Sequence, residues 1–174
     1  MKRIIISGIV IVIIALCGFR YYTINKNFPS KYEKEEYTTS EWINMENIAL
    51  KFNSWEIIKN TKNEGRSDII VNITVKKLGE DIDLNEILRE AQINITDSKR
   101  SLFMYEKVKE FGSDGTVEIK MATSIGNVDI DYIKSGKPIL VQLPKELYKK
   151  EVEEKVEKGK LYAKYVNISE GKLD

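Results

Sequence analysis

Histidine is absent from the 174-residue chain, and cysteine occurs once, at Cys17. Without these residue types the rest of the chain cannot form a Ser-His-Asp triad, a Cys-His pair or a zinc site with Cys or His ligands. Most common hydrolase and redox mechanisms are therefore excluded, and we assign no catalytic residue, cofactor or metal site. An internal disulfide beyond Cys17 is also excluded, so the fold must depend on packing.

An excess of positive charge is also missing. The chain has 28 lysine and arginine residues and 27 aspartate and glutamate residues. Without the first twenty residues, which include Lys2, Arg3 and Arg20, the balance is 25 to 27, a net charge of −2. Such a chain has little attraction for phosphate backbones, so nucleic acid is not expected as a partner.

The N-terminal segment is the clearest feature that is present. Lys2 and Arg3 precede residues 4–19, a run without charge, asparagine or glutamine. Basic residues stay on the cytoplasmic side while an apolar run enters the bilayer. As a helix the run is about 24 Å long, against a hydrocarbon core of about 30 Å, and Arg20 would extend it at the interface. This predicts a single-pass signal anchor over residues 1–20 in the cell membrane, with the bilayer as partner through residues 4–19.

Two alternatives remain for this segment. Ala15 and Cys17 are small residues at alternate positions before Gly18, as at a signal-peptidase site. Lipidation at Cys17 is the second alternative, although Leu16 stands where a lipobox has a small residue. The anchor, the cleaved signal and the lipoprotein all place the remaining chain outside the cytoplasm.

The remainder is long enough for one domain with a single core. Residues 21–44 are predicted to form a charged stalk, with Trp42 marking where packing begins, and residues 45–174 the domain. Ile69, Val71, Ile73 and Val75 alternate with Ile70, Asn72 and Thr74, which predicts a central strand. The alternation over residues 48–57 changes phase at Asn53 and Ser54, as at a β-bulge. Shorter strands are predicted over residues 91–96, 102–106, 116–122, 128–133, 139–143 and 161–168.

Two helices interrupt this series. Residues 83–91 have leucines and isoleucine at helical spacing, and Asp83 with Glu86 is typical of a capping box. Residues 145–158 follow Pro144 and contain Glu-Lys pairs four apart, with a narrow apolar stripe. The strands and turns predict a mainly β fold, an immunoglobulin-like antiparallel β-sandwich with one or two short helices, preceded by a transmembrane helix.

Several segments carry a resemblance to a known group of proteins. They are residues 21–29 after the apolar run, 47–52 leading into Ser54 and Trp55, 70–75, 95–100 and 141–144. With them the chain resembles uncharacterised membrane-anchored proteins of low-GC Gram-positive bacteria, whose extracellular domains are similar to telokin-like immunoglobulin folds. The resemblance implies no catalytic residues.

Acidic residues give two candidate sites. Asp81, Asp83 and Asn85 match the start of a calcium loop, but Glu86 and Gln92 stand where glycine and glutamate belong, so we interpret Asp83 as a helix cap. Asp129 and Asp131 could form an acidic patch with Asp114, although a solvated strand face is the favoured interpretation.

Aromatic and asparagine residues are candidates for glycan contacts and glycan attachment. Trp42, Trp55, Tyr32 and Tyr37 could stack on sugars, but core packing is favoured, notably for Trp55. Three glycosylation-like motifs are interpreted as polar strand faces; they begin at Asn72, Asn94 and Asn167.

The sequence therefore predicts a non-enzymatic, membrane-tethered binding or accessory module that binds an unidentified protein or envelope component. The alternative is a carboxylate-based hydrolase of cell-envelope glycans, which needs two carboxylates in a cleft. A third hypothesis is a passive accessory or immunity subunit acting within the membrane plane.

Overall fold

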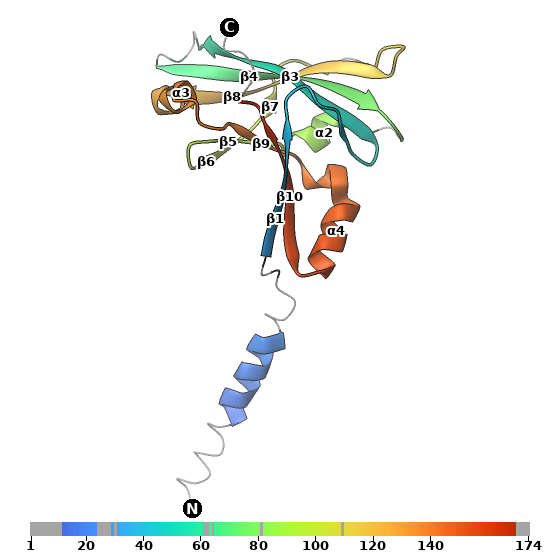
Figure 1. Ribbon diagram of the computed structural model, residues 1–174, viewed down its shortest axis with the longest axis vertical. Helices are drawn as coiled ribbons and strands as arrows, with labels where there is room; N and C mark the ends of the chain where they lie inside the picture. Colours follow the sequence, from blue (N-terminus) through green and yellow to red (C-terminus); the bar gives the residue numbers. More distant parts are fainter. Residues whose placement is uncertain are drawn as a thin grey trace, which may run out of the picture.

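Two five-stranded sheets form the fold of this computed structural model (Figure 1). The structure describes residues 12–23, 29, 31–60, 63, 65–80, 82–108 and 110–169. Sheet A has the order β1-β10-β9-β5-β6, with β1 Lys31–Thr38, β10 Lys160–Asn167, β9 Leu140–Gln142, β5 Gln92–Ile95 and β6 Ser98–Ser101. Sheet B has the order β2-β3-β4-β8-β7, with β2 Ile43–Asn44, β3 Ile48–Lys59, β4 Arg66–Lys77, β8 Thr116–Gly126 and β7 Phe103–Met104. The predicted β-sandwich is confirmed.

The long strands of sheet B follow the predicted alternation. Ile69, Val71, Ile73 and Val75 are each at most 2% exposed and point into the sandwich. The register of β3 against β4 shifts between Phe52 and Ser54, which confirms the predicted bulge. After the bulge Trp55 is buried as predicted, and its Nε1 donates to the Ile168 carbonyl over 2.5 Å.

Strand β1 lies within the segment that was predicted to be a stalk. All eight of its residues pair with β10, from Lys31 opposite Lys160 to Thr38 opposite Asn167. The pairing is parallel, so the expectation of a wholly antiparallel sandwich is wrong at this edge. The segment has few apolar residues, so hydrophobic alternation does not predict a strand there.

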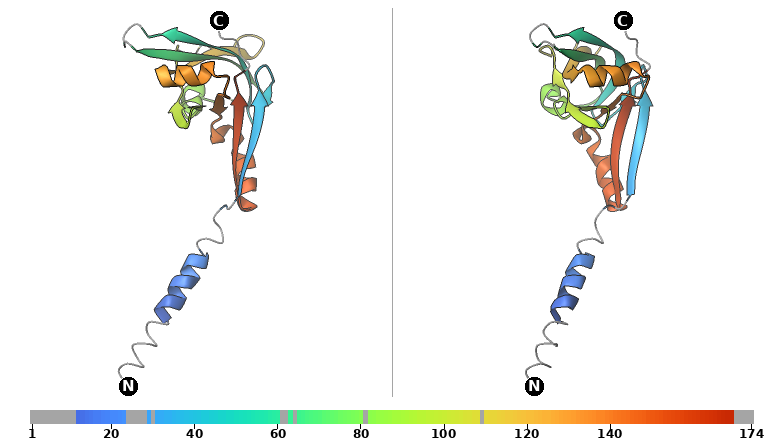
Figure 2. Two further views of the ribbon diagram at one scale, coloured as in Figure 1. Left: turned by 60° about the vertical axis from the view of Figure 1, so that its left-hand side comes forward. Right: turned by 90° about the vertical axis from the view of Figure 1, so that its left-hand side faces the viewer.

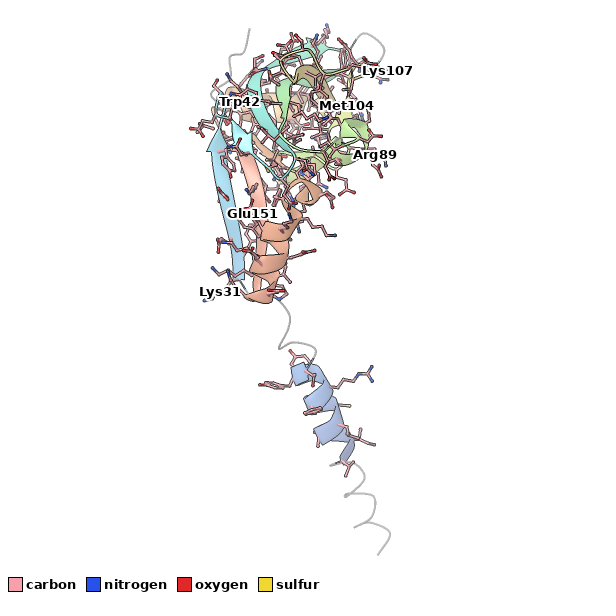
Figure 3. The ribbon with its side chains drawn as sticks, turned by 90° about the vertical axis from the view of Figure 1, so that its right-hand side faces the viewer. Lys31, Trp42, Arg89, Met104, Lys107 and Glu151 are labelled. Carbon is pink, nitrogen blue, oxygen red and sulfur yellow. The ribbon has the colours of Figure 1, made fainter. Side chains whose placement is uncertain are left out.

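An arm extends from the sandwich (Figure 2). We use this name for β1, residues 160–164 of β10 and the helix α4, which precedes β10 and lies beside it. Lys31 lies at the tip of the arm and Glu151 along its length (Figure 3). Any part of the chain before Lys31 therefore joins the domain at this tip.

Within the described part of the chain, four short helices connect the strands: α2 Leu84–Leu88, α3 Asn127–Lys134, the 3₁₀ helix η1 Lys145–Tyr148 and α4 Lys149–Glu157. The two predicted helices are confirmed, the second as η1 followed by α4. The predicted strand over residues 128–133 is wrong, because these residues form α3. Asp129 accepts the Gly126 backbone N–H over 2.9 Å, which favours the start of a helix there.

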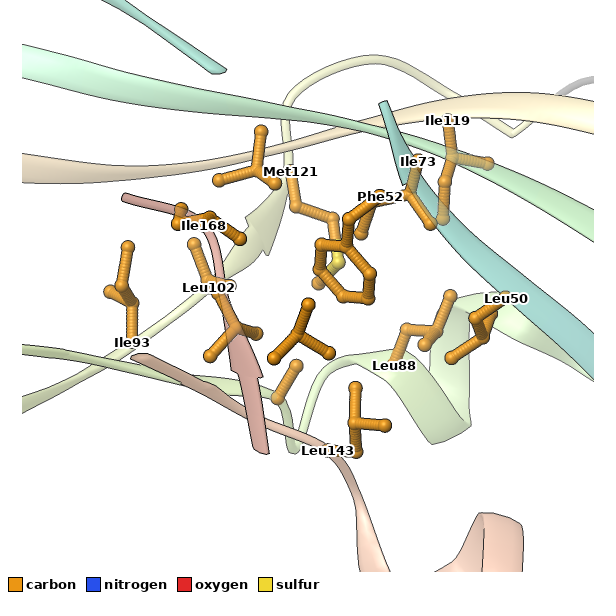
Figure 4. Close-up of a cluster of buried hydrophobic side chains, with 14 of the residues drawn as sticks. Leu50, Phe52, Ile73, Leu88, Ile93, Leu102, Ile119, Met121, Leu143 and Ile168 are labelled. Atoms are coloured by element: carbon orange, nitrogen blue, oxygen red, sulfur yellow. The ribbon is translucent and has the colours of Figure 1, made fainter. Parts of the chain in front are cut away.

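The apolar core fills the space between the sheets (Figure 4). Sheet B contributes Phe52 and Met121, and sheet A contributes Ile93. Leu102, between β6 and β7, and Leu143, directly after β9, complete this part of the core. Burial of a side chain of this size contributes about 1.5–3 kcal/mol, so this core is the main source of stability.

Residues 12–23 are helical. The predicted anchor extends over residues 1–20, and residues 1–11 lie outside the described part of the chain. Within the described residues, no helix combines the length and the apolar character needed to cross a membrane.

Candidate functional site

A polar cavity of about 410 Å³ lies on the outer face of sheet B. We call it the sheet-B groove. The segment after β7 contributes Glu106, Lys107 and Val108, and the remaining walls come from β3, β4 and β8. Its polar lining consists of Asn53, Ser54, Asn72, Glu118, Lys120 and the two polar residues of that segment, Glu106 and Lys107.

Strand alternation and the bulge together produce this lining. Asn72 lies opposite both Ser54 and Lys120, between neighbours that point into the core. The bulge puts two consecutive polar residues on the outer face: the Asn53 Nδ2 donates to Thr74 Oγ1 over 2.8 Å, and the Asn72 Nδ2 donates to Ser54 Oγ over 3.0 Å. Ordinary alternation would send one of these two side chains to the core.

The groove offers acceptors and balanced charge. Both asparagine amides use their Nδ2 within the protein, and the described residues provide no donor to their oxygens. Lys120 Nζ lies 3.3 Å from Glu106 Oε1, and Glu118 and Lys107 add one charge of each sign. No aromatic side chain is among the lining residues, so the groove suits hydrogen bonds and ion pairs rather than stacking on a sugar.

A second polar cluster lies in the arm around a buried lysine. Lys164 is 3% exposed, and its Nζ lies 2.8 Å from Glu151 Oε1 and 4.0 Å from Glu35 Oε2. The same nitrogen lies 5.8 Å from the centroid of the Tyr37 ring and 5.3 Å from the centroid of the Tyr148 ring. Carboxylates and aromatic faces together compensate the charge that burial takes out of water.

The other groups of the arm also have partners. Tyr162 donates to Glu35 and Glu151, and burial together with Glu35 raises the pKa of its hydroxyl. Hydrogen bonds from Lys155 and Lys160 lower the pKa of Glu33 from 4.5 to about 2. For Glu35, burial acts to raise the pKa, but hydrogen bonds from Tyr162 and Tyr37 outweigh it and the net shift is downward. Because these groups satisfy one another, we interpret the cluster as a fastening of α4 and β1 onto β10.

The predicted acidic sites are not assembled. Asp83 caps α2 by accepting the backbone N–H groups of Asn85 and Glu86, as predicted, while Asp81 lies outside the described residues. Asp129 and Asp131 do not share a strand face, because they lie on α3, where Asp129 is buried against Arg100 and Asp131 is exposed. Among the described residues no group of three or more Asp, Glu or Cys is arranged to hold a metal ion.

Asp114 and the candidate aromatic residues are also dispersed. Asp114 bonds to Thr116 within its own turn. Trp42 is 44% exposed, beneath Lys51. Tyr37 belongs to the arm cluster, and the Tyr32 and Tyr165 hydroxyls are 2.6 Å apart.

The three asparagine motifs begin on three different strands. Asn72 lines the groove, Asn94 lies in β5 and Asn167 in β10. The sequence predicts Asn72 on a polar strand face but does not predict the groove, because the wall after β7 comes from a segment distant in the chain from Asn72. The phase shift at Asn53 was the available signal.

Comparisons with known proteins identify no family for this chain. No protein-family model matches the chain, and no curated protein matches it significantly. An uncharacterised β-sandwich protein from Clostridium difficile 630 is similar in structure, with 14% identity, a TM-score of 0.49, and 80% of this chain and 99% of that chain covered. The yjhA protein from Bacillus subtilis has 16% identity, a TM-score of 0.43, and 79% and 99% covered.

Proposed function

We propose that this chain is a non-enzymatic binding module, tethered to the outer face of a membrane by its N-terminal segment, that binds a polar ligand in the sheet-B groove. The observation that carries the proposal is the groove itself, a cavity of about 410 Å³ with acceptors and both signs of charge on rigid strands. Binding sites of a few hundred Å³ with a few well-placed polar groups are typical of small-ligand recognition.

The strand order supports an immunoglobulin-like classification. Sheet B contains the order β3-β4-β8-β7, and sheet A contains β10-β9-β5-β6. These are the orders A-B-E-D and G-F-C-C′ of immunoglobulin domains. On this correspondence β1 is an added strand beside G, and α4 lies within the F–G connection. Domains of this class are widely used as binding modules, and the analogy raises the expectation of binding without identifying a ligand.

The arm supports the tether. The apolar run over residues 4–19 and the basic residues before it favour membrane attachment. The chain from such an anchor enters the domain at Lys31, where β1 is paired along its whole length with β10. The arm would therefore act as a rigid spacer between the membrane and the groove.

The lining chemistry favours a zwitterionic ligand. Two lysines can bind carboxylates, two glutamates can bind amines, and the amide oxygens of Asn53 and Asn72 can accept N–H or O–H groups. The peptide parts of bacterial cell-wall polymers carry amino, carboxyl and amide groups together. We therefore place short peptide-bearing wall fragments first among the ligands.

Calorimetric titration of the full-length chain, in a non-ionic detergent, with purified peptide-bearing wall fragments tests this. Lys120→Gln removes a charged contact in the groove, and we expect it to weaken binding by about tenfold. Lys76→Gln is the matched control, because Lys76 lies on β4, on the same outer face of sheet B as Lys120 but outside the groove lining. Equal affinities for the two variants, or no binding by the native chain, would contradict the proposal.

A hydrolase is the second candidate, since Glu106 and Glu118 line the same groove. Such an enzyme needs two carboxylates on either side of the scissile bond. Release of reducing ends from insoluble wall glycan, abolished in Glu118→Gln, would establish hydrolysis. Fragment binding without such release would establish the binding module.

A further inference from the structure

A second cavity, of about 370 Å³, is lined by residues from the start of β4, the β5–β6 turn, β6, the end of β8 and the first turn of α3. These elements come together at one end of the sandwich (Figure 1). We call it the two-arginine cavity, because Arg66 at the start of β4 and Arg100 in β6 both line it. Thr96, Ser124 and the first residues of α3 complete the wall. It shares no lining residue with the sheet-B groove.

Arg100 is fixed in place by one buried carboxylate. Its Nη2 lies 3.1 Å and 2.8 Å from the two oxygens of Asp129, which is 3% exposed. Asp129 also accepts the Gly126 N–H, so its negative charge is matched within the protein. The described residues provide no acceptor for the Nη1 of Arg100, which leaves donors on the fixed guanidinium for a ligand.

Arg66 supplies the uncompensated charge. Its backbone pairs with Gly126, which holds it beside the first turn of α3. The side chain is exposed and has no ion pair among the described residues. Arg66, Arg100 and Asp129 together give the cavity a net charge of +1.

Unsatisfied polar atoms also gather here. Three buried side-chain atoms have no hydrogen-bond partner within the described part of the chain: Arg100 Nε, Ser124 Oγ and Asn94 Oδ1. Two of the three, Arg100 Nε and Ser124 Oγ, belong to residues that line this cavity. Such orphaned groups in a cavity wall are a sign of a missing partner.

We propose that the two-arginine cavity binds a phosphate ester. Guanidinium groups match phosphate oxygens in geometry and charge, and the N–H groups of Asn127 and Val128 at the start of α3 have no acceptor within the helix. The cavity is larger than a phosphate ion requires, so the phosphate belongs to a larger molecule. The cavity lies on the sandwich, away from the arm tip where an anchor would join, and this favours a phosphate ester of the medium or wall over a lipid headgroup of the anchoring membrane.

The test is calorimetric titration of the full-length chain, in non-ionic detergent and at constant ionic strength, with glycerol 3-phosphate. We expect saturable binding that Arg66→Gln weakens at least about tenfold. Arg89→Gln is the matched control, because Arg89 is an exposed arginine at the C-terminal end of α2, and it should bind as the native chain does. Arg100 is left intact, because its removal would leave Asp129 buried without a partner.

Two further measurements complete the test. Lys120→Gln, in the sheet-B groove, should leave phosphate-ester binding unchanged, so this site and the proposed function can fail separately. Binding to phosphatidylglycerol vesicles tests whether the phosphate that the cavity recognises belongs to a lipid headgroup. Three results would each overturn the proposal. They are equal weakening of glycerol 3-phosphate binding in Arg66→Gln and Arg89→Gln, no binding of glycerol 3-phosphate by the native chain, and Arg66-dependent binding to the vesicles alone.

Discussion

The two halves of β10 are held in different ways. In the sandwich half, Val166 and the following Ile168 are at most 1% exposed and lie in the apolar core. In the arm half, Lys160 and Lys164 form ion pairs with carboxylates of β1 and α4. Along its length, β10 thus begins in a region stabilised by paired charges and ends in one stabilised by apolar burial.

This difference has physical consequences. Apolar burial has no directional requirement and does not depend on pH, whereas an ion pair needs both partners in place and in their charged forms. Exposed ion pairs contribute about 0–1 kcal/mol each, so the arm depends mainly on the buried Lys164 cluster. We expect the arm to loosen under conditions in which the sandwich stays folded.

The largest effect is expected in the sandwich core. Val71→Asp places an unpaired carboxylate at a position with 0% exposure, between β3 and β8. The cost should exceed about 4 kcal/mol, enough to abolish folding of a domain of ordinary stability. Circular dichroism and urea unfolding measure it. Asn72→Ser, on the opposite face, should change stability by less than about 0.5 kcal/mol, and similar behaviour of the two variants would show that the strand phase is wrong.

The next effect concerns the buried lysine of the arm. Glu151→Ala leaves Lys164 buried without its nearest carboxylate, and we expect the free energy of unfolding to fall by about 1–3 kcal/mol. The effect is smaller than that of breaking a fully buried pair, because Glu151 is half exposed. Lys164→Met removes the charge itself and should cost less than about 1 kcal/mol. Urea unfolding compares them. If Lys164→Met is the more destabilising variant, the stability of the arm does not depend on compensating the buried charge of Lys164.

Acid should separate the arm from the sandwich. The pKa of Glu33 is lowered from 4.5 to about 2 in the folded protein, because Lys155 and Lys160 bond to its carboxylate. Its stabilisation is therefore complete above pH 4.5 and is lost as the pH falls towards 2. Amide-exchange protection of β1 should decrease in this window before that of β4, and less so in Glu33→Gln, whose side chain does not titrate. Simultaneous loss in β1 and β4 would contradict an independently loosening arm.

The smallest effect is expected at a pair within α4. Lys149 and Glu153 are 3.8 Å apart with mostly exposed side chains. Lys149→Ala should therefore change stability by less than about 0.5 kcal/mol in urea unfolding. Lys155→Ala, which removes a contact to Glu33 across the arm, should cost more. A reversal of this order would mean that local helix pairs, rather than contacts to β1, hold α4.

Local patterns in the sequence determined much of the sandwich. Alternation identified β3, β4 and β8, the phase shift at Asn53 identified the bulge, and Asp83 marked the start of α2. Each of these features depends on residues close together in the chain, where burial of one face or capping of one turn decides the structure. The sequence also placed Trp55 in the core.

Tertiary structure decided the arm, α3 and both cavities. Lys155 bonds to Glu33 from 122 residues away, and the charged residues of β1 give no hydrophobic signal that would predict a strand. Val128, Ile130 and Tyr132 alternate like a strand, yet the burial of Asp129 against Arg100 fixes a helix in that position. Charged groups take the structure that provides partners for them, and only the folded chain provides those partners, whereas apolar periodicity can be read from the sequence itself.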